Sequence, residues 1–223
     1  SSVYDGDAYA TPLGNVPVDR EFAAKLAARE PRIKVSERGH GEAQGRGEHS
    51  LEVQLPFLQR VLGQFKLVPI VMGDQSYDLS RALGAALAKL MQERKQDPLL
   101  QPGTVIVASS DLSHFHPYDD AVKLDRKVLN AIEEWDYFNM SQNFARRIWE
   151  ACGGGPIVAA MIAAERLQAN QAKVLKYANS GDVAGGDRSR VVGYGAVVLT
   201  GGTGKQREKS QALSFTQDES CGK

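Results

Sequence analysis

The sequence predicts an α/β domain in which a central mixed or parallel sheet is flanked by helices. Short runs of apolar and β-branched residues, typical of buried strands, alternate with longer segments in which leucine recurs at helical spacing. This alternation favours strands joined by helical crossovers. With 223 residues, 42% hydrophobic and 24% charged, the chain is long enough for one domain with its own core. We expect this domain over residues 1–200 and a flexible tail or linker over residues 201–223, which are mostly polar.

The first part of the chain predicts short extended pieces, a helix and a loop. Residues 3–18 are interrupted by proline and glycine, which predicts short strands around a turn. Asp19 is a residue type that commonly caps a helix, and we expect that helix to run to about Arg29. Residues 36–47 are rich in glycine and charged side chains, which predicts a mobile surface loop.

The middle of the chain predicts two strands separated by a helix. Segment 48–62 has leucines at helical spacing and predicts a helix bent by Pro56, because proline lacks the N–H of the helical ladder. Residues 67–72 and 104–108 are short apolar runs that predict strands, and residues 79–91 between them predict a helix. A helical crossover of this kind predicts parallel neighbouring strands.

The second half continues the same pattern. Helical periodicity predicts helices over residues 119–135 and 157–167. Apolar runs predict two further strands over residues 173–177 and 191–199. The simplest organisation is one α/β domain.

Composition excludes several classes of protein. Lys plus Arg equals Asp plus Glu, 27 of each, so there is no net charge to attract nucleic acid or an anionic membrane surface. No apolar run approaches the roughly 20 residues that span a bilayer, and no signal peptide opens the sequence. Two cysteines are too few for a disulfide framework. We therefore predict a cytoplasmic protein that binds neither nucleic acid nor membrane.

The segment after the predicted strand 104–108 is the first candidate site. Ser110, Asp111, Ser113 and His114 follow that strand directly. In open α/β sheets, ligands bind beyond the carboxyl ends of the strands. A histidine there can act as acid or base near neutral pH, and an aspartate beside it can fix its tautomer. The alternative is a Ser/Asp helix cap followed by a surface histidine.

A second candidate cluster consists of Glu48, His49 and Glu52. The two glutamates would lie one helical turn apart, at the start of the predicted helix. The zinc-protease motif H-E-x-x-H is absent. The alternative is a solvated helix face with a terminal histidine.

Three further residues have both a functional and a structural interpretation. Ser180 and Asp182 follow the predicted strand 173–177, and Asp182 suits either a hard metal ion or a turn. Cys152 precedes three glycines, so it is either a thiolate at a helix terminus or a small buried residue, and burial is the commoner case.

Six separated segments of the sequence form a recognisable set. In chain order they are EHSLEVQLPFLQ, VPIVMG, VASSDLSHFH, CGGGPIVA, YANSGD and RVVGYGAVVL. Over residues 9–199 the chain resembles the Memo family, called AmmeMemoRadiSam system protein B in prokaryotes. The resemblance implies a fold similar to the class III extradiol dioxygenases, a central sheet flanked by helices.

The resemblance also implies roles for particular residues. His49 and His114 match histidines that line the family's pocket, with Asp111 beside His114, which would act as acid or base. Five more side chains are expected to contribute to the pocket: Glu48, Ser110, Ser113, Cys152 and Ser180. The implied metal is iron, held by two histidines and a carboxylate, or copper. Asp182 is the position at which this chain could supply the carboxylate.

The family's two metal-binding histidines belong to segments that precede the part matching Ser1 onward. We therefore expect that the domain lacks its N-terminal part and that one edge of its sheet is exposed. Partner proteins of the AmmeMemoRadiSam system are implied as well.

Three hypotheses for function follow. The first is a metal-dependent oxidoreductase of extradiol-dioxygenase type, with His114 as acid or base, Asp111 orienting it and His49 contacting substrate or oxygen. The second is a protein that uses the same pocket to bind a peptide or a small molecule without turnover. The third is a protein that handles a redox metal without oxidising an organic substrate.

Overall fold

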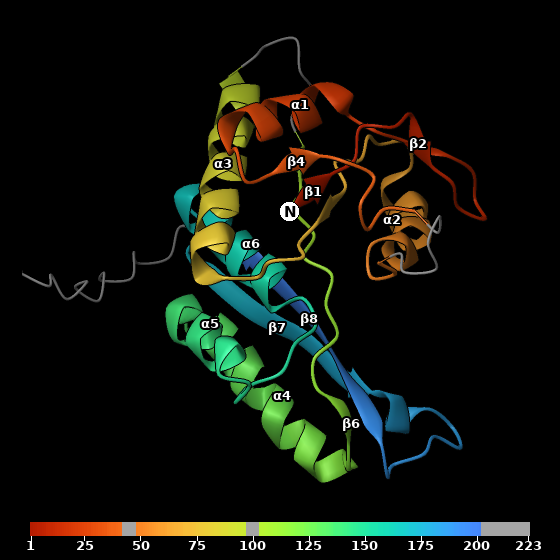
Figure 1. Ribbon diagram of the computed structural model, residues 1–223. Helices are drawn as coiled ribbons and strands as arrows, with labels where there is room; N and C mark the ends of the chain where they lie inside the picture. The colour runs from red at the N-terminus through yellow and green to blue at the C-terminus, as the bar shows by residue number, and fades with distance from the viewer. Residues whose placement is uncertain (42–47, 97–102, 202–223) are drawn as a thin grey trace, which may run out of the picture.

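The computed structural model describes residues 1–41, 48–96 and 103–201. Within these ranges the chain forms mixed sheets flanked by helices, which confirms the predicted α/β class. Figure 1 shows an upper part with α1 and α3 and a lower part with α4 and the long strands β7 and β8. The predicted tail begins at residue 201, and residues 202–223 lie outside the described ranges.

The upper part is built around a small three-stranded sheet. β1 (Ser2–Val3) lies in the middle, parallel to β4 (Lys34–Val35) and antiparallel to β5 (Ile70–Val71). A separate hairpin pairs β2 (Ala8–Tyr9) with β3 (Val16–Pro17). The short extended pieces predicted for the start of the chain are therefore present.

Helix α1 (Arg20–Arg29) begins where the sequence predicts. The Asp19 carboxylate accepts the main-chain N–H of Phe22 at 3.1 Å and so caps the helix. Its other oxygen accepts the Arg94 guanidinium at 2.7 Å. Arg94 belongs to α3 (Tyr77–Gln96), so the same carboxylate fixes the start of one helix and ties it to another.

The predicted helix over residues 48–62 is shorter than expected. A 3₁₀ turn (Glu52–Gln54) leads into α2 (Leu55–Leu62), and Pro56 occupies the first turn of α2. Proline is tolerated there because the first N–H groups of a helix have no partner within it. Pro56 therefore lies at the start of the helix and does not bend its middle.

The lower part contains the longer strands. β8 (Val191–Thr200) pairs with β7 (Gln171–Asn179) on one side and with β6 (His114–His116) on the other, both antiparallel. Three helices belong to this part: α4 (Tyr118–Glu133), α5 (Tyr137–Ala145) and α6 (Gly154–Arg166).

The prediction of a strand over residues 104–108 is wrong for the described structure. The segment is in no sheet, and its main-chain groups form no hydrogen bond with any described residue. Ile106 packs on the upper core, while Val105 and Val107 are 71% and 51% exposed. The expected parallel pairing with residues 67–72 is absent as well, since β5 pairs only with β1 among the described strands. The apolar run has the composition of a strand, but no other described segment pairs with it.

Two hydrophobic clusters form the core, one in each part, and α6 contributes to both. Helices α3 and α6 pack closely at Gly84, where a Cβ would lie 2.5 Å from the Ala159 carbonyl oxygen. Among the described helices, none has a stretch both long and apolar enough to cross a membrane.

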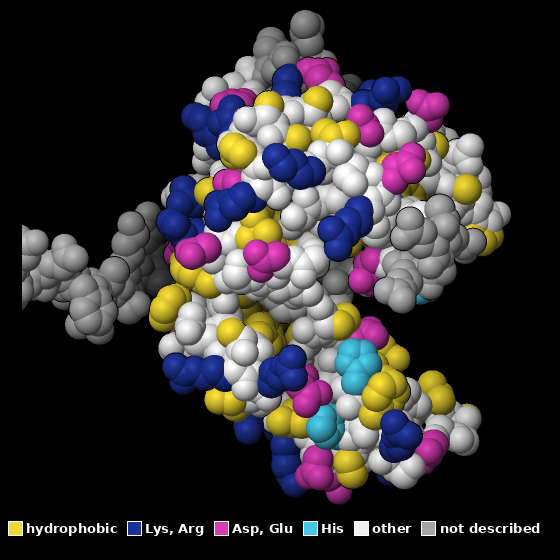
Figure 2. Space-filling view, viewed as in Figure 1, with side chains coloured by type: hydrophobic (Ala, Val, Ile, Leu, Met, Phe, Trp, Pro, Cys, Tyr) yellow, Lys and Arg dark blue, Asp and Glu magenta, His cyan; other side chains and the backbone are white. Residues whose placement is uncertain are grey.

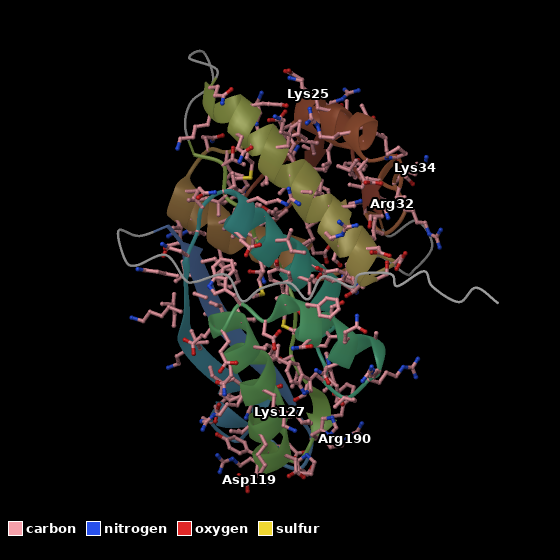
Figure 3. The ribbon with its side chains drawn as sticks, turned by 90° about the vertical axis from the view of Figure 1, so that its left-hand side faces the viewer. Lys25, Arg32, Lys34, Asp119, Lys127 and Arg190 are labelled. Atoms are coloured by element: carbon pink, nitrogen blue, oxygen red, sulfur yellow. The ribbon has the colours of Figure 1, made fainter. Side chains whose placement is uncertain are left out.

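Charged side chains of both signs are intermingled on the face shown in Figure 2. Figure 3 shows the same mixture from the side, with Lys25, Arg32 and Lys34 on the upper part and Asp119, Lys127 and Arg190 on the lower. This distribution agrees with the balanced composition and gives no large basic surface on the faces in view.

Candidate functional site

The loop from Ser109 to His114 is fixed to β8 by its main chain. The Leu112 N–H donates to the Gly193 carbonyl at 2.9 Å, and the Gly193 N–H donates to the Ser113 carbonyl at 3.0 Å. These two bonds hold the loop in register with the sheet, so the side chains of the first candidate cluster stand on a rigid base.

A buried carboxylate supports the same loop from below. Asp125, on α4, is 0% exposed; it accepts the Ser113 N–H at 2.8 Å and the Tyr177 hydroxyl at 2.7 Å. Burial, and then the hydrogen bond to Asp125, raise the pKa of Tyr177, so its hydroxyl remains a proton donor. Ser113 itself is fully buried, and its hydroxyl has no partner among the described residues.

The side chains of Asp111 and His114 lie close to each other on this loop. Asp111 Oδ2 lies 3.5 Å from His114 Nε2, and both side chains are partly exposed. This distance is at the limit of a hydrogen bond and suits an ion pair when the imidazole is protonated.

Cys152 lies next to this pair and is exposed, so the expectation of a small buried residue is wrong. Its sulfur accepts the Asp111 N–H at 3.1 Å and lies 3.8 Å from the Ser110 hydroxyl oxygen. That hydroxyl donates to the Asp111 carbonyl at 2.6 Å and accepts the Gly153 N–H at 2.8 Å. The hydrogen bonds of the Ser110 hydroxyl thus join the loop to the start of α6, and the Cys152 thiol is exposed beside this junction.

The second cluster lies at and just before the 3₁₀ turn Glu52–Gln54. His49 Nδ1 lies 2.8 Å from Glu52 Oε1, and the His49 side chain is 71% exposed. Glu48 accepts the Ser50 N–H at 3.0 Å. A hydrogen bond joins this segment to the first loop, because the Gln54 amide donates to the Ser109 hydroxyl at 3.0 Å.

A small hollow of about 100 Å³ brings parts of the two clusters together. Glu48, Ser109 and Cys152 line it with polar groups, and Met72 and Val107 contribute apolar surface. His49, Asp111 and His114 are not among its lining residues. The structure therefore joins the clusters through Glu48 and Cys152 and leaves the two histidines outside the hollow.

Ser180 and Asp182 form a tight turn after β7. Asp182 accepts the Asn179 N–H at 2.8 Å and the Tyr118 hydroxyl at 2.7 Å. These two hydrogen bonds, in that order, lower the pKa of Asp182. The Ser180 hydroxyl accepts the Val192 N–H at 3.0 Å. Both side chains thus act as turn formers, one of the alternatives left open by the sequence.

The implied iron or copper does not fit the described residues. No group of three or more His, Cys, Asp or Glu side chains within them is arranged to hold a metal ion. Asp182, the proposed carboxylate ligand, already uses both oxygens in the turn.

Two arrangements near the site were not predicted. His116 Nε2 lies 2.9 Å and 3.0 Å from the two Glu150 oxygens, and Glu150 also accepts the His114 N–H at 3.4 Å. Between the two histidines, Phe115 has a φ of 62°, a left-handed conformation that is uncommon for a residue other than glycine. It coincides with an irregularity in the pairing of β6 with β8. The density of histidines in SSDLSHFH is the only sequence signal for this feature.

The second unpredicted arrangement is a ring cluster in the upper part. The Tyr9 hydroxyl lies 2.6 Å from His40 Nδ1, and His40 Nε2 lies 3.2 Å from the Ser2 hydroxyl. Tyr4 stacks on the His40 ring, with centroids 5.6 Å apart. Burial lowers the pKa of His40, whereas burial, then Tyr4 and Glu52, raise that of Tyr9. No sequence pattern links these residues.

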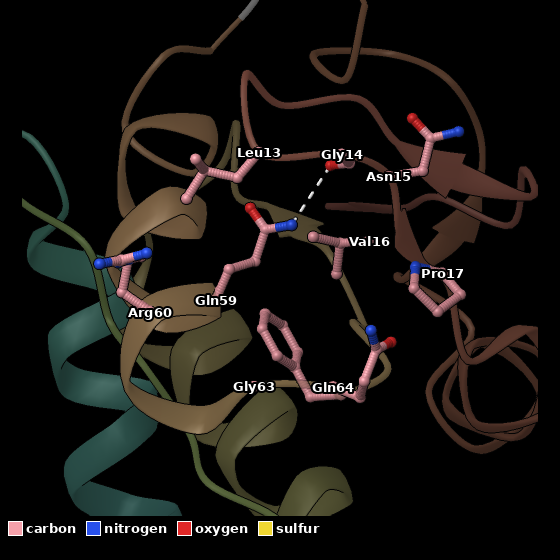
Figure 4. Close-up of a pocket in the computed structure, with 10 residues that line it drawn as sticks. Leu13, Gly14, Asn15, Val16, Pro17, Gln59, Arg60, Gly63 and Gln64 are labelled. Atoms are coloured by element: carbon pink, nitrogen blue, oxygen red, sulfur yellow. Dashed lines mark hydrogen bonds between the residues drawn. The ribbon is translucent and has the colours of Figure 1, made fainter.

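A larger hollow of about 530 Å³ lies away from the candidate site (Figure 4). The β2–β3 hairpin and the end of α2 enclose it, and the Gln59 amide donates to the Gly14 carbonyl at 3.2 Å across it. Among its described lining residues, Arg60 is the one ionisable side chain. An arginine stays protonated, so the described lining does not suit proton-transfer chemistry.

Comparison with known proteins gives a consistent result. The family model described as "Memo-like protein" matches residues 1–198. A MEMO1 family protein of Methanopyrus kandleri is 39% identical over 203 residues, which are 91% of this chain and 67% of the relative. Those of Methanosarcina mazei and Sulfolobus acidocaldarius are 39% and 38% identical over 194 residues.

These matches cover 86% of this chain and 67% and 64% of the relatives. The chain thus spans about two thirds of the length of the curated relatives it matches. Because the family model covers nearly the whole described structure, the chain belongs to the Memo-like protein family.

Proposed function

We propose that this chain carries the proton-transfer wall of a small-molecule or peptide binding site, with His114 as acid or base and Asp111 as its orienting carboxylate. The observation that carries the proposal is the 3.5 Å approach of the two side chains on a loop fixed by β8 and Asp125. The exposed Cys152 thiol and the hollow beside it give a ligand a place to contact this wall.

The proposed chemistry needs only groups that the structure describes. A ligand hydroxyl near His114 would donate its proton to the imidazole, and the Asp111 carboxylate would stabilise the imidazolium that forms. Asp111 is itself restrained, because its N–H donates to the Cys152 sulfur. His49 lies on the segment that the Gln54–Ser109 hydrogen bond joins to this loop, and its role in contacting the ligand stays a prediction.

Catechol is a suitable probe, because extradiol enzymes act on aromatic diols. We expect saturable binding, followed by the ring resonances of His114 in NMR spectra. In His114→Gln the affinity should fall, because the proton acceptor is lost, whereas the matched His116→Gln variant should keep it. Absence of saturable binding, or an unchanged affinity in His114→Gln, would refute the proposal.

The finer proposal, metal-dependent oxidation in the manner of extradiol dioxygenases, rests on the family resemblance alone. The described residues do not account for a metal site, so metal-dependent oxidation is not a step that they explain. We expect no stoichiometric iron or copper on this chain after dialysis, as measured by elemental analysis. One equivalent of tightly bound metal, with oxygen consumption lost in His114→Gln, would instead establish the oxidoreductase.

A further inference from the structure

Tyr194, on β8, lies on the face of the lower sheet that points away from α4. A Cβ at Gly193 would collide with the Asp125 carboxylate of α4. A Cβ at Gly195 would lie 2.8 Å from Leu129, on the same helix. The residues on either side of Tyr194 thus face α4. Because successive residues of a strand point to opposite faces, the Tyr194 side chain points away from that helix, and it is 44% exposed.

The side chains of Asp111 and His114 occupy the same face as Tyr194. Leu112 and Ser113, which lie between them in the sequence, are both buried. Leu112 packs in the lower hydrophobic cluster, and the Ser113 N–H donates to the Asp125 carboxylate. Since these two residues turn toward α4, Asp111 and His114 point away from it, and their side chains approach to 3.5 Å.

The register of the sheet brings Tyr194 level with Asp111. The loop runs antiparallel to β8, and the Leu112 N–H donates to the Gly193 carbonyl. The residue after Gly193 therefore lies opposite the residue before Leu112. Burial, and then the Asp111 charge, raise the pKa of Tyr194, so its hydroxyl stays protonated at neutral pH and can donate a hydrogen bond.

Proton transfer to His114 creates a charge that a hydrogen-bond donor would stabilise. When a ligand hydroxyl gives its proton to the ring, its oxygen keeps the electron pair of the O–H bond and becomes an oxyanion near the Asp111 carboxylate. Two like charges repel, so a donor directed at the oxyanion favours the transfer. The Ser110 hydroxyl and the Asp111 N–H already donate to other acceptors. The Tyr194 hydroxyl has no hydrogen-bond partner among the described residues.

We propose that Tyr194 is the donor that stabilises this oxyanion, with its hydroxyl directed at the ligand oxygen that His114 deprotonates. This role depends on the proposed function, because both concern the same ligand oxygen. The proton goes to Nδ1 of His114, since Nε2 faces Asp111, and no bond to carbon forms or breaks. Tyr194 keeps its own proton, so it binds the product of the transfer and does not carry the proton itself.

The probe for this role is 4-nitrocatechol, because ionisation of its hydroxyl changes its visible absorption. The pKa of the bound probe is measured by absorbance in the wild-type protein and in the variants. We expect Tyr194→Phe to raise this pKa by about one unit, which corresponds to a tenfold weaker preference for the oxyanion. The matched control is Tyr137→Phe, which removes a hydroxyl that donates to Glu165 outside the candidate site. It should leave the pKa of the bound probe unchanged.

The affinity of His114→Gln for the same probe separates this role from the proposed function. If His114→Gln weakens binding but Tyr194→Phe leaves the pKa of the bound probe unchanged, the role of Tyr194 is refuted and the proposed function stands. Weaker binding in Tyr194→Phe without a change of this pKa would likewise reduce Tyr194 to a structural residue. If the wild-type protein does not bind the probe, or His114→Gln binds it equally well, both are refuted. Equal rises of the pKa in Tyr194→Phe and Tyr137→Phe would also overturn the assignment.

Discussion

The buried Asp125 carboxylate makes a sharp prediction about the candidate site. Its Oδ2 accepts the Tyr177 hydroxyl at 2.7 Å, and its Oδ1 accepts the Ser113 N–H. Tyr177→Phe removes the first donor and leaves a charged oxygen, 0% exposed, with one partner fewer. Hydrogen bonds to buried charged groups contribute about 1.5–3 kcal/mol. We expect the free energy of unfolding to fall by about 2–3 kcal/mol.

The matched control is Tyr137→Phe. The Tyr137 hydroxyl also donates to a carboxylate, Glu165 Oε2 at 2.9 Å, but that bond is exposed to water. Water can replace the lost donor there, so we expect a loss below about 1 kcal/mol. Urea unfolding followed by circular dichroism measures the free energy of unfolding of both variants. The midpoint urea concentration should fall further for Tyr177→Phe than for Tyr137→Phe.

Thermal unfolding is an independent measurement of the stability of the Tyr177→Phe and Tyr137→Phe variants. For a domain of this size, 1 kcal/mol corresponds to about 2–4 °C in Tm, so Tyr177→Phe should lower Tm by roughly 4–12 °C. Exchange of the Ser113 amide should quicken only in this variant, because Asp125 accepts that N–H. Equal effects of the two substitutions would refute the reasoning that burial of Asp125 makes the bond important.

Three further predictions concern other parts of the molecule. Gly193→Ala places a Cβ 1.8 Å from Asp125 Oδ2 and should prevent folding or cost about 3 kcal/mol or more in urea unfolding, whereas Gly41→Ala, with open space around it, should be neutral. Burial lowers the pKa of His40 in the folded state. The stability that the neutral ring contributes is therefore present above the unfolded-state pKa of about 6.5 and is lost as the pH falls through the folded-state pKa. Amide exchange near His40 should quicken below about pH 6.5, and His40→Gln should remove this pH dependence. Cys152 is exposed, so in a variant whose other cysteine is serine it should react fully with a thiol reagent without denaturant, and slow or partial reaction would contradict the exposed position.

The sequence predicted best those elements whose signals are local. The α1 helix begins after Asp19 because that carboxylate caps it directly. The predicted strands 173–177 and 191–199 are present and longer than expected, since each pairs with the other along its length. Pairing extends a strand beyond its apolar run, and a single sequence does not show where the partner ends.

The errors fall where a distant partner decides the structure. Residues 104–108 have a strand's composition, but strand formation needs a neighbouring edge, and no described residue supplies one. Cysteine is a residue type that is usually buried, but Cys152 is exposed. It contacts Ser110 and Asp111, which lie 42 and 41 positions earlier in the sequence. The His40–Tyr9 contact likewise joins residues 31 positions apart and leaves no periodic trace.

The hydrogen bonds that hold the loop of Asp111 and His114 bear on the proposed chemistry. This loop is bonded to β8, to the buried Asp125 and to Glu150. A group that transfers a proton gains from such a fixed position, because no reorganisation is needed when the charge moves. The support of this loop is therefore what the proposed role of His114 as proton acceptor requires.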